Sequence, residues 1–420
     1  MSVTHLRTRI RLKIKLSSAA LPTCVWILSL LAIPCWIAAD NGDCAWDSKV
    51  FFDAVQILHS GGDPYLVGIH AQDEYLQHSH FTPNIPFGYV YTPITLPVLR
   101  VLGFMPWPLL TACYWLLYGV AIALVLWVSQ HLAEPDERLF ASILAPLTLF
   151  FPGLLIFDTV LSGNFAFILY GAIFLGLWLG WKRNCWLPFY VAILLASCCK
   201  PTYLTLLAIP LFSARKPWIP VLSAGVSGVA LFRLQAWLWP TLFQHFMTAI
   251  DRIFNLRNDY GAGPAGRLAD FLADRNIPSA RPMAIAYLCI SGVLFLVLLY
   301  LSRFYRRGTI GSQQWFPLML LGVFLLNPRF VEYEIYPITI AMGLIAYRLA
   351  MATGFPRICA AVLFPVWCTL NYFANASRVS WKNIECAILL LLFVAGSWEL
   401  WRQIRRNAGQ LPRPTGPVSA

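Results

Sequence analysis

Residues 107–132 of the chain read WPLLTACYWLLYGVAIALVLWVSQHL, a run without Asp, Glu, Lys or Arg. A transmembrane helix needs about 20 mainly apolar residues, so this run is long enough to cross a bilayer. The whole chain has the same character, since 59% of its residues are hydrophobic and 12% are charged. A soluble domain carries about 25% charged residues. The sequence therefore predicts an integral membrane protein.

Similar apolar blocks lie on both sides of this run. The block at residues 21–39 follows a basic stretch and could be a signal peptide. We interpret it as an uncleaved first helix, because it is long for a signal and many blocks follow. The later blocks lie at residues 140–157, 165–181, 186–199, 202–212, 218–239, 283–301, 315–326, 335–349, 358–370 and 384–401. Together they predict an all-α, polytopic membrane helical bundle with about 12 transmembrane helices.

The charges predict how this bundle is oriented. The chain has 31 Lys and Arg against 19 Asp and Glu, a formal net charge of +12, which in a soluble protein would suggest a nucleic acid partner. Here most of the excess lies in short loops and tails, as the positive-inside rule predicts for cytoplasmic segments. We expect a basic cytoplasmic N-terminus at residues 1–20, a transmembrane domain at 21–402 and a disordered cytoplasmic tail at 403–420. The expected location is the plasma membrane, without a nucleic acid partner.

The cysteines do not predict a disulfide framework. Most of the eleven lie in or beside apolar blocks, where cysteine behaves as a small hydrophobe, and no CxxC pair occurs. The pair His78 and His80 in a loop is too little for a metal site. We expect neither a metal ion nor a cofactor.

Three interruptions of the apolar pattern are candidates for function. Residues 40–100 and 240–282 are long, mixed segments that alternation places on the outer face. The third is Lys200-Pro201, between two blocks that are each too short to cross a hydrocarbon core of about 30 Å. Proline breaks a helix, and a lysine within the bilayer is costly. We therefore expect two half-length helices that meet at a cavity, with Lys200 facing it.

The first outer segment begins with an amphipathic helix. One helical face carries the apolar residues Val50, Phe51, Ala54, Val55 and Leu58. We expect this face to lie against the membrane surface. Asp47 begins the helix and points roughly toward the apolar face, while Asp53 projects elsewhere. The alternative role of Asp47 is that of a helix N-cap.

Short motifs along the chain carry a family resemblance. They are Asp47 after the first block, Gly61-x-x-Pro64-Tyr65, Tyr89-x-Tyr91-Thr92-Pro93, Ser162-Gly163-Asn164, Lys200-Pro201, and Asn327-Pro328-Arg329 with Tyr333. In this order they resemble the membrane glycosyltransferases of family 87, which belong to the multi-spanning GT-C superfamily. The resemblance implies a GT-C-type bundle that transfers a sugar, with inversion, from a polyprenyl-phosphate carrier. The acceptor would be a lipid-linked glycan or a polysaccharide on the outer face.

The resemblance also implies roles for individual residues. Asp47 would be the general base that takes the proton of the acceptor hydroxyl, while cations hold the leaving phosphate. The candidates for the phosphate are Lys200, Arg329 and Arg257. Arg329 could instead anchor at the membrane interface or pair with Glu332 or Glu334. The candidates for substrate binding are Asp53, Tyr65, Tyr91, Asn164 and Tyr333, of which Asn164 could instead cap a helix.

Two other functions remain open from the sequence. A membrane transporter or lipid flippase would use Lys200 as a midplane site, and an inactive scaffold would use none of these residues. A carboxylate directly after the first span suits deprotonation of a hydroxyl and has no obvious role in transport, which favours the enzyme. The expected partners are the lipid-linked donor, the acceptor and membrane lipids. The sequence leaves the acceptor and the sugar, a mannose-like hexose or a pentose, unidentified.

Overall fold

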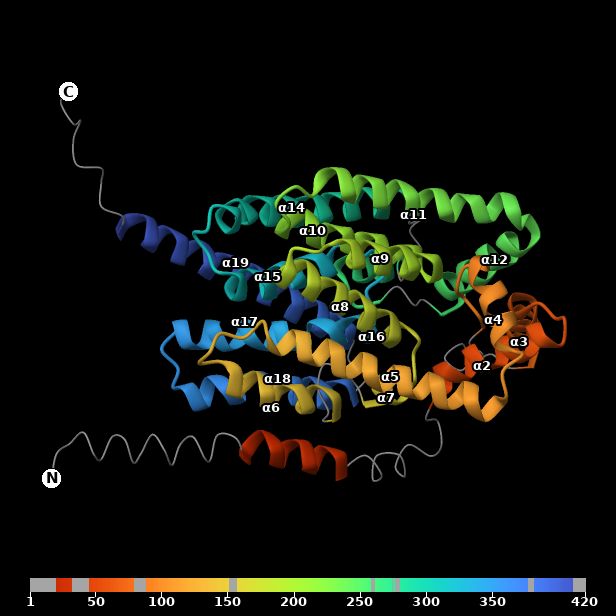
Figure 1. Cartoon of the computed structure of the whole chain (residues 1–420), viewed down its shortest axis with the longest axis horizontal. Coiled ribbons are helices and arrows are strands. Elements are labelled where there is room, and N and C mark those ends of the chain that lie inside the picture. The colour runs from red at the N-terminus through yellow and green to blue at the C-terminus, as the bar shows by residue number, and fades with distance from the viewer. Residues whose placement is uncertain are drawn as a thin grey trace.

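The computed structural model describes residues 20–31, 45–78, 88–150, 157–257, 261–273, 275, 280–376 and 381–410. Long helices run side by side along the longest axis, and short helices gather at one end (Figure 1). Regular structure in these ranges is helical, apart from an isolated β-bridge between Gly261 and Phe330. The all-α prediction is confirmed.

Most of the long helices coincide with apolar blocks of the sequence, while the two long mixed segments form helices of their own. The first described helix is Ala20–Leu31. It is followed by α2 (Trp46–His59), α3 (Pro64–His78), η2 (Pro93–Thr95), α4 (Leu96–Leu102), α5 (Trp107–Gln130), α6 (Arg138–Phe150), α7 (Phe157–Leu161), α8 (Ala166–Arg183), α9 (Leu187–Cys199), η3 (Pro201–Leu207), α10 (Ala208–Ser213), α11 (Trp218–Leu238), α12 (Pro240–Arg257), α13 (Pro264–Ala273), α14 (Ala280–Arg306), α15 (Ser312–Leu325), α16 (Glu332–Ile335), η4 (Tyr336–Ile338), α17 (Thr339–Ala352), α18 (Arg357–Ala376) and α19 (Trp381–Gln410).

Several of these helices are suited to cross a bilayer. Within the described ranges, five are long and apolar enough: Trp107–Gln130, Trp218–Leu238, Ala284–Arg306, Tyr333–Ala352 and Lys382–Arg406. Shorter apolar helices of 10–17 residues accompany them. The chain is therefore a multi-pass membrane protein, as predicted, while the number of about 12 spans stays a prediction.

The centre of the bundle is built from α15 and α17. Every residue of α15 from Trp315 to Leu325 is buried, and so is most of α17. The outer helix α11 instead exposes large apolar side chains, including Ile219 and Trp237, which are 83% and 78% exposed. Such a surface is rare in soluble proteins, so these side chains are suited to contact lipid.

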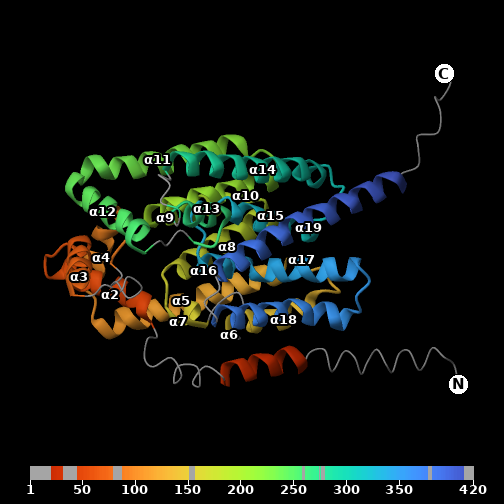
Figure 2. The same ribbon diagram turned by 180° about the vertical axis from the view of Figure 1, so that it is seen from behind.

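The short helices at one end come from the two predicted outer segments. α2, α3 and α4 belong to the first segment and α12 to the second, and they lie together when the bundle is seen from behind (Figure 2). The predicted amphipathic helix is confirmed as α2. Its apolar face is covered by protein, however, because Phe51 and Phe52 pack against the aromatic rings of Tyr114 and Trp107 in α5, with ring centres 5.2 and 5.3 Å apart.

The predicted break at Lys200 is also present. α9 ends at Cys199, Lys200 is extended (φ −137°, ψ 113°), and the 3₁₀ helix η3 begins at Pro201. The Thr92 backbone N–H donates to the Cys199 carbonyl at 3.2 Å, and the Thr92 hydroxyl donates to the Cys198 carbonyl. Since Thr92 belongs to the first predicted outer segment, the break lies level with that segment and not midway along the bundle.

The predicted ends of the domain need one correction. The tail was expected to be disordered from residue 403, but α19 continues to Gln410. The sequence there, RQIRRNAGQ at residues 402–410, contains strong helix formers, and its arginines suit the negative end of a helix dipole. Residues 1–19, 32–44 and 411–420 lie outside the described part of the chain, so the predictions for them are untouched.

Candidate active site

The start of α2 is fixed by a turn far along the chain. The backbone N–H groups of Asp47 and Ser48 both donate to the Ser162 carbonyl at 3.0 Å, and that of Ala45 donates to the Leu161 carbonyl at 2.8 Å. The first N–H groups of a helix have no partner within the helix. Here the carbonyls of the turn after α7 satisfy them, which fixes the position of Asp47.

The Ser162-Gly163-Asn164 motif forms this turn. Gly163 has φ +68°, and a Cβ on it would lie 2.9 Å from the Ser48 Cβ and 2.7 Å from the Trp115 ring. Only glycine allows both this backbone conformation and this close approach. Tyr114 donates its hydroxyl to the Gly163 carbonyl at 2.5 Å, which fixes the turn to α5.

Asn164 connects this turn to the carboxylate. Its Nδ2 donates to Asp47 Oδ2, and its Oδ1 accepts the Ala166 N–H at 2.8 Å, at the start of α8. Asn164 therefore caps a helix, the alternative left open by the sequence, and at the same time orients Asp47. Asp47 itself is not an N-cap, because Ala45 precedes α2 and no side chain caps that helix.

The surroundings of Asp47 make it a stronger base than an ordinary aspartate. Its side chain is 8% exposed, and burial raises its pKa above the usual 3.8. The Lys200 cation, the hydrogen bond from Asn164 and the Arg329 cation oppose this effect without cancelling it. Burial disfavours the charged form, while nearby cations favour it. Asp47, Lys200 and Arg329 are thus electrostatically coupled, although they are far apart in the sequence.

Lys200 is held between two tyrosines. Its Nζ donates to the Tyr333 hydroxyl at 2.9 Å and lies 4.4 Å from the Tyr333 ring centre and 5.4 Å from that of Tyr91. Aromatic rings attract a cation through their negative faces. No carboxylate of the described residues lies within ion-pair distance of Nζ. The ammonium is consequently positioned without being neutralised by an acidic side chain in that part of the chain.

Lys200 and Arg329 lie on the wall of a cavity of about 540 Å³. Most of its wall is apolar and comes from α11 to α14, and the charged residues on it are Lys200, Arg329 and Glu334. The apolar lining includes Val90, Phe232, Phe246, Met247, Ile250, Ile253, Ala265 and Ala269. The sequence predicted that Lys200 faces a cavity, and this is confirmed. Asp47 is not part of the lining.

Asn327 and Glu334 form a polar network beside Arg329, and Glu334 is one of the two acidic residues that the sequence offered as a partner of Arg329. Asn327 Nδ2 donates to Glu334 Oε2 at 2.6 Å, and Asn327 Oδ1 accepts the Arg329 backbone N–H at 3.2 Å. Glu334 is 3% exposed. The sequence did not predict the contact between Asn327 and Glu334, although an acidic residue at the start of an apolar span indicates a polar partner, because such residues in membrane helices are costly.

The other predicted residues have different positions. Tyr65 is fully buried, and its hydroxyl donates to the Tyr91 carbonyl at 2.5 Å. It therefore fixes the backbone at Tyr91. Asp53 is exposed, on a different face of α2 from the buried Asp47. The side chain of Arg257 lies outside the described part of the structure. The structure thus brings Asp47, Asn164, Lys200, Tyr91, Tyr333 and Arg329 together, but not Asp53.

Comparison with known proteins identifies the family. Residues 89–328 match the sequence profile of glycosyltransferase family 87, which is more than half of the 420 residues. The chain belongs to glycosyltransferase family 87. No curated protein and no solved structure matches it. The part that matches family 87 contains Tyr91, Asn164 and Lys200, while Asp47 lies before it and Arg329 directly after it.

Proposed function

We propose that this family 87 glycosyltransferase transfers a mannose-like hexose or a pentose from a polyprenyl-phosphate sugar to an acceptor hydroxyl. The acceptor is a lipid-linked glycan or a polysaccharide. The observation that carries the proposal is an apolar cavity with Lys200 and Arg329 on its wall, electrostatically coupled to the buried carboxylate Asp47. This combination fits a ligand that is a hydrocarbon at one end and a phosphate ester at the other.

The cavity supports a lipid-linked donor. The side chains of Phe246, Met247 and Ile250 on α12 offer a surface for the first isoprene units. Lys200 and Arg329 provide charge-assisted hydrogen bonds to phosphate oxygens. Glu334 and Asn327 position the Arg329 segment. No metal ion is needed to neutralise the phosphate in this scheme.

The reaction follows from these positions. Ionised Asp47 accepts the proton of the acceptor hydroxyl as its oxygen attacks the anomeric carbon. The bond between that carbon and the donor phosphate oxygen breaks, and its electron pair leaves with the polyprenyl phosphate. Lys200 and Arg329 stabilise the charge that develops on the phosphate. Attack from the face opposite the leaving group inverts the anomeric centre, and no second carboxylate is required as an acid.

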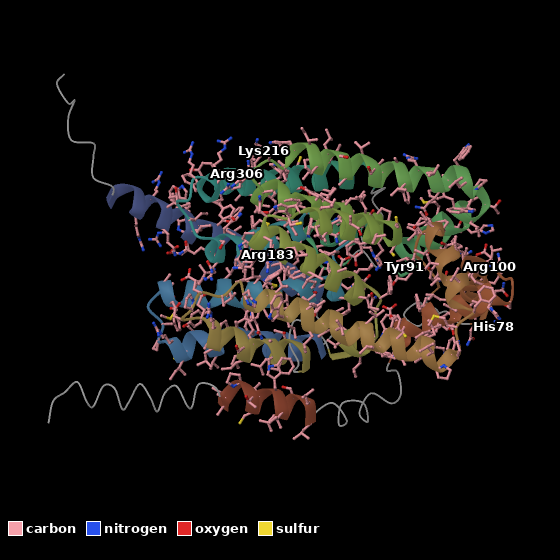
Figure 3. All side chains as sticks on the ribbon, in the orientation of Figure 1. His78, Tyr91, Arg100, Arg183, Lys216 and Arg306 are labelled. Carbon is pink, nitrogen blue, oxygen red and sulfur yellow. The ribbon has the colours of Figure 1, made fainter. Side chains whose placement is uncertain are left out.

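The distribution of charge supports a site on the outer face. Arg183, Lys216 and Arg306 lie toward one end of the bundle, and Tyr91, Arg100 and His78 toward the other (Figure 3). Loops rich in Lys and Arg stay in the cytoplasm. We therefore infer that the basic end is cytoplasmic, with both chain termini, and that the Tyr91 end faces outward from the plasma membrane.

Two findings favour the enzyme over the transporter or flippase: membership of family 87, and the position of the helix break at Lys200 along the bundle. A transporter site would be expected near the bilayer midplane, between repeats. Here Thr92 of the first outer segment is hydrogen-bonded to the helix end that precedes Lys200. A binding site level with an outer segment suits transfer at the membrane surface.

The test is a transfer assay with purified enzyme in detergent or membranes. Radiolabelled polyprenyl-phosphate hexoses and pentoses are supplied one at a time, with a lipid extract of the host as acceptor. Asp47→Asn is compared with Glu334→Gln and with Asp136→Asn, a matched control whose aspartate is exposed between α5 and α6. We expect label to enter the acceptor from one carrier, and only Asp47→Asn to lose transfer by about 100-fold or more.

Two results would contradict the proposal at different points. Transfer that survives in Asp47→Asn but is abolished in Glu334→Gln would assign the base to Glu334. Wild-type protein that incorporates no label, but moves the labelled carrier across sealed vesicles, would establish the flippase instead.

A further inference from the structure

A second cavity lies at the basic end of the bundle, away from the candidate active site. It has a volume of about 770 Å³. Its wall is formed where three connections meet: the α8–α9 turn with Asn184, the α10–α11 link with Arg215, and the α14–α15 turn with Gly308. Figure 3 shows its Arg306 near Lys216 and far from Tyr91, so this cavity is separate from the one that contains Lys200.

Two arginines give this cavity a positive charge. Arg215 and Arg306 are both on its wall and both exposed. Arg306 Nη2 donates to the Leu211 carbonyl, which uses one of its five N–H groups. Among the residues that the structure describes, no carboxylate lies within ion-pair distance of either guanidinium. The remaining donors of the two arginines are available to an anion.

The rest of the wall is aromatic and polar. Trp181 stacks on Phe316 with ring centres 4.7 Å apart, and the Lys182 Nζ lies 3.7 Å from the Trp181 ring centre. Asn184 and Ser213 add further hydrogen-bonding groups. Tryptophans and cations at the ends of membrane helices lie at the depth of lipid headgroups. Leu187 at the start of α9 and Ile219 in α11 are 70% and 83% exposed, so lipid-facing surface begins beside the cavity.

We propose that this cavity binds the phosphate headgroup of an anionic phospholipid from the leaflet at the basic end. The arginines contact the phosphate, the aromatic wall packs against the glycerol region, and the acyl chains extend along the exposed apolar side chains of α9 and α11. Basic pockets between membrane helices are suited to such headgroups, because charge and apolar contact are combined in one place. The inference does not depend on the proposed sugar transfer.

The test measures lipid binding to full-length protein in a neutral detergent. Native mass spectrometry counts phosphatidylglycerol and, in parallel, phosphatidylcholine retained by the wild type, Arg215→Gln and Arg306→Gln. Arg303→Gln is the matched control: it removes the same charge from α14, but Arg303 is not on the cavity wall. Arg215→Gln breaks no hydrogen bond within the described residues, so it tests the site without disturbing the fold. We expect about tenfold weaker retention of phosphatidylglycerol in the two cavity variants.

Added inorganic phosphate distinguishes a lipid from a free anion. We expect phosphatidylglycerol to raise the melting temperature of the wild type and of Arg303→Gln, while inorganic phosphate has little effect. An equal rise with inorganic phosphate, lost in Arg215→Gln, would show a soluble-anion site and overturn the lipid assignment. Equal retention by Arg215→Gln and Arg303→Gln would show binding by general surface charge, and the proposal would fail.

Discussion

Asp47 is held where burial and nearby cations act on its acidity in opposite directions. Burial raises its pKa above 3.8, and the Lys200 and Arg329 cations limit the rise. Burying an ionised carboxylate costs free energy, so the folded protein holds the Asp47 proton more tightly than the unfolded chain does. This protonated carboxyl stabilises the fold at low pH, and the stabilisation is lost as the pH rises through the raised pKa of Asp47. At neutral pH, the Asp47→Asn variant therefore need not lose stability. A loss of transfer in it can be assigned to chemistry when its melting temperature is unchanged or higher.

The pH dependence of transfer tests this environment. A general base must be ionised, so activity falls as pH drops through the raised pKa of Asp47, and the acid limb of kcat/KM lies above pH 3.8. Removing the Lys200 cation by Lys200→Met removes the largest effect that lowers this pKa, so the acid limb moves to higher pH. A limb that does not move in Lys200→Met would show that the two groups are not coupled in the enzyme.

Lys200 should also determine donor affinity. Its ammonium has no acidic partner among the described residues and is oriented by Tyr333, so it can bind a phosphate without first breaking an ion pair. Loss of a charge-assisted hydrogen bond weakens binding by about tenfold or more. We expect Lys200→Met to raise KM for the polyprenyl-phosphate sugar by that factor, measured from initial rates. Lys216→Met, an exposed lysine, serves as the control, and an equal KM in both variants would refute the phosphate role.

At the scale of elements, the turn between α7 and α8 fixes the start of α2. Gly163→Ala places a Cβ 2.9 Å from Ser48 and forces a backbone conformation that costs about 1–2 kcal/mol for alanine. We expect a lower melting temperature and a loss of transfer, because Asp47 and Asn164 move apart. The matched control is Gly119→Ala in α5, where a Cβ would meet nothing within 4 Å. Equal activity in the two variants would exclude a positioning role for the turn.

Among the described residues, two polar side-chain pairs and a hydrogen bond from Arg252 to the Ile69 carbonyl attach the second outer segment to the first. Arg252 in α12 binds both carboxylate oxygens of Asp73 in α3, at 2.6 and 3.2 Å, and His245 Nδ1 lies 2.7 Å from Asp63 Oδ2. α12 also supplies Phe246 and Ile250 to the cavity wall. The pairs therefore connect the donor cavity to the helices that follow Asp47.

Breaking the pair between Arg252 and Asp73 should make the position of α12, which forms part of the wall of the cavity that contains Lys200, less well defined. Asp73 is 44% exposed, so we expect Arg252→Ala to cost about 1 kcal/mol or less in stability but to raise KM for the donor. The hydrogen bond from Arg252 holds the Asp73 pKa below its usual value, so the stabilising effect is present above that usual value and is lost as pH falls. A double-mutant cycle with Asp73→Ala measures the coupling, and strictly additive effects on KM would show that the pair does not hold the wall.

At the scale of the whole molecule, the sequence predicted the positions of the bundle helices well, but it predicted poorly which helices pack against each other. Apolar blocks and Pro201 located most of the long bundle helices to within a few residues, because the bilayer dictates length and proline dictates a break, but they did not locate α3, α4, α12 or α13. The packing of α2 on α5 was missed, since an amphipathic face does not reveal whether lipid or protein covers it. Asn164 and Lys200 were found through short motifs. Glu334 was named only as a possible partner of Arg329, and its hydrogen bond with Asn327 was not predicted, because the approach of these two side chains is set by the fold and by no local pattern.

The orientation of the bundle follows from charge and can be tested directly. The Gly61-Gly62 turn after α2 is exposed at the end that carries the candidate site, and the Gly308-Thr309 turn is exposed on the α14–α15 connection at the basic end. Loops rich in Lys and Arg resist translocation, so the basic end should be cytoplasmic. An epitope inserted at Gly61-Gly62 should bind antibody on intact spheroplasts, and one at Gly308-Thr309 only after permeabilisation, with melting temperature as the check on folding. The reverse pattern would place the candidate site in the cytoplasm, where the carrier would have to present its sugar to Asp47 from the inner leaflet.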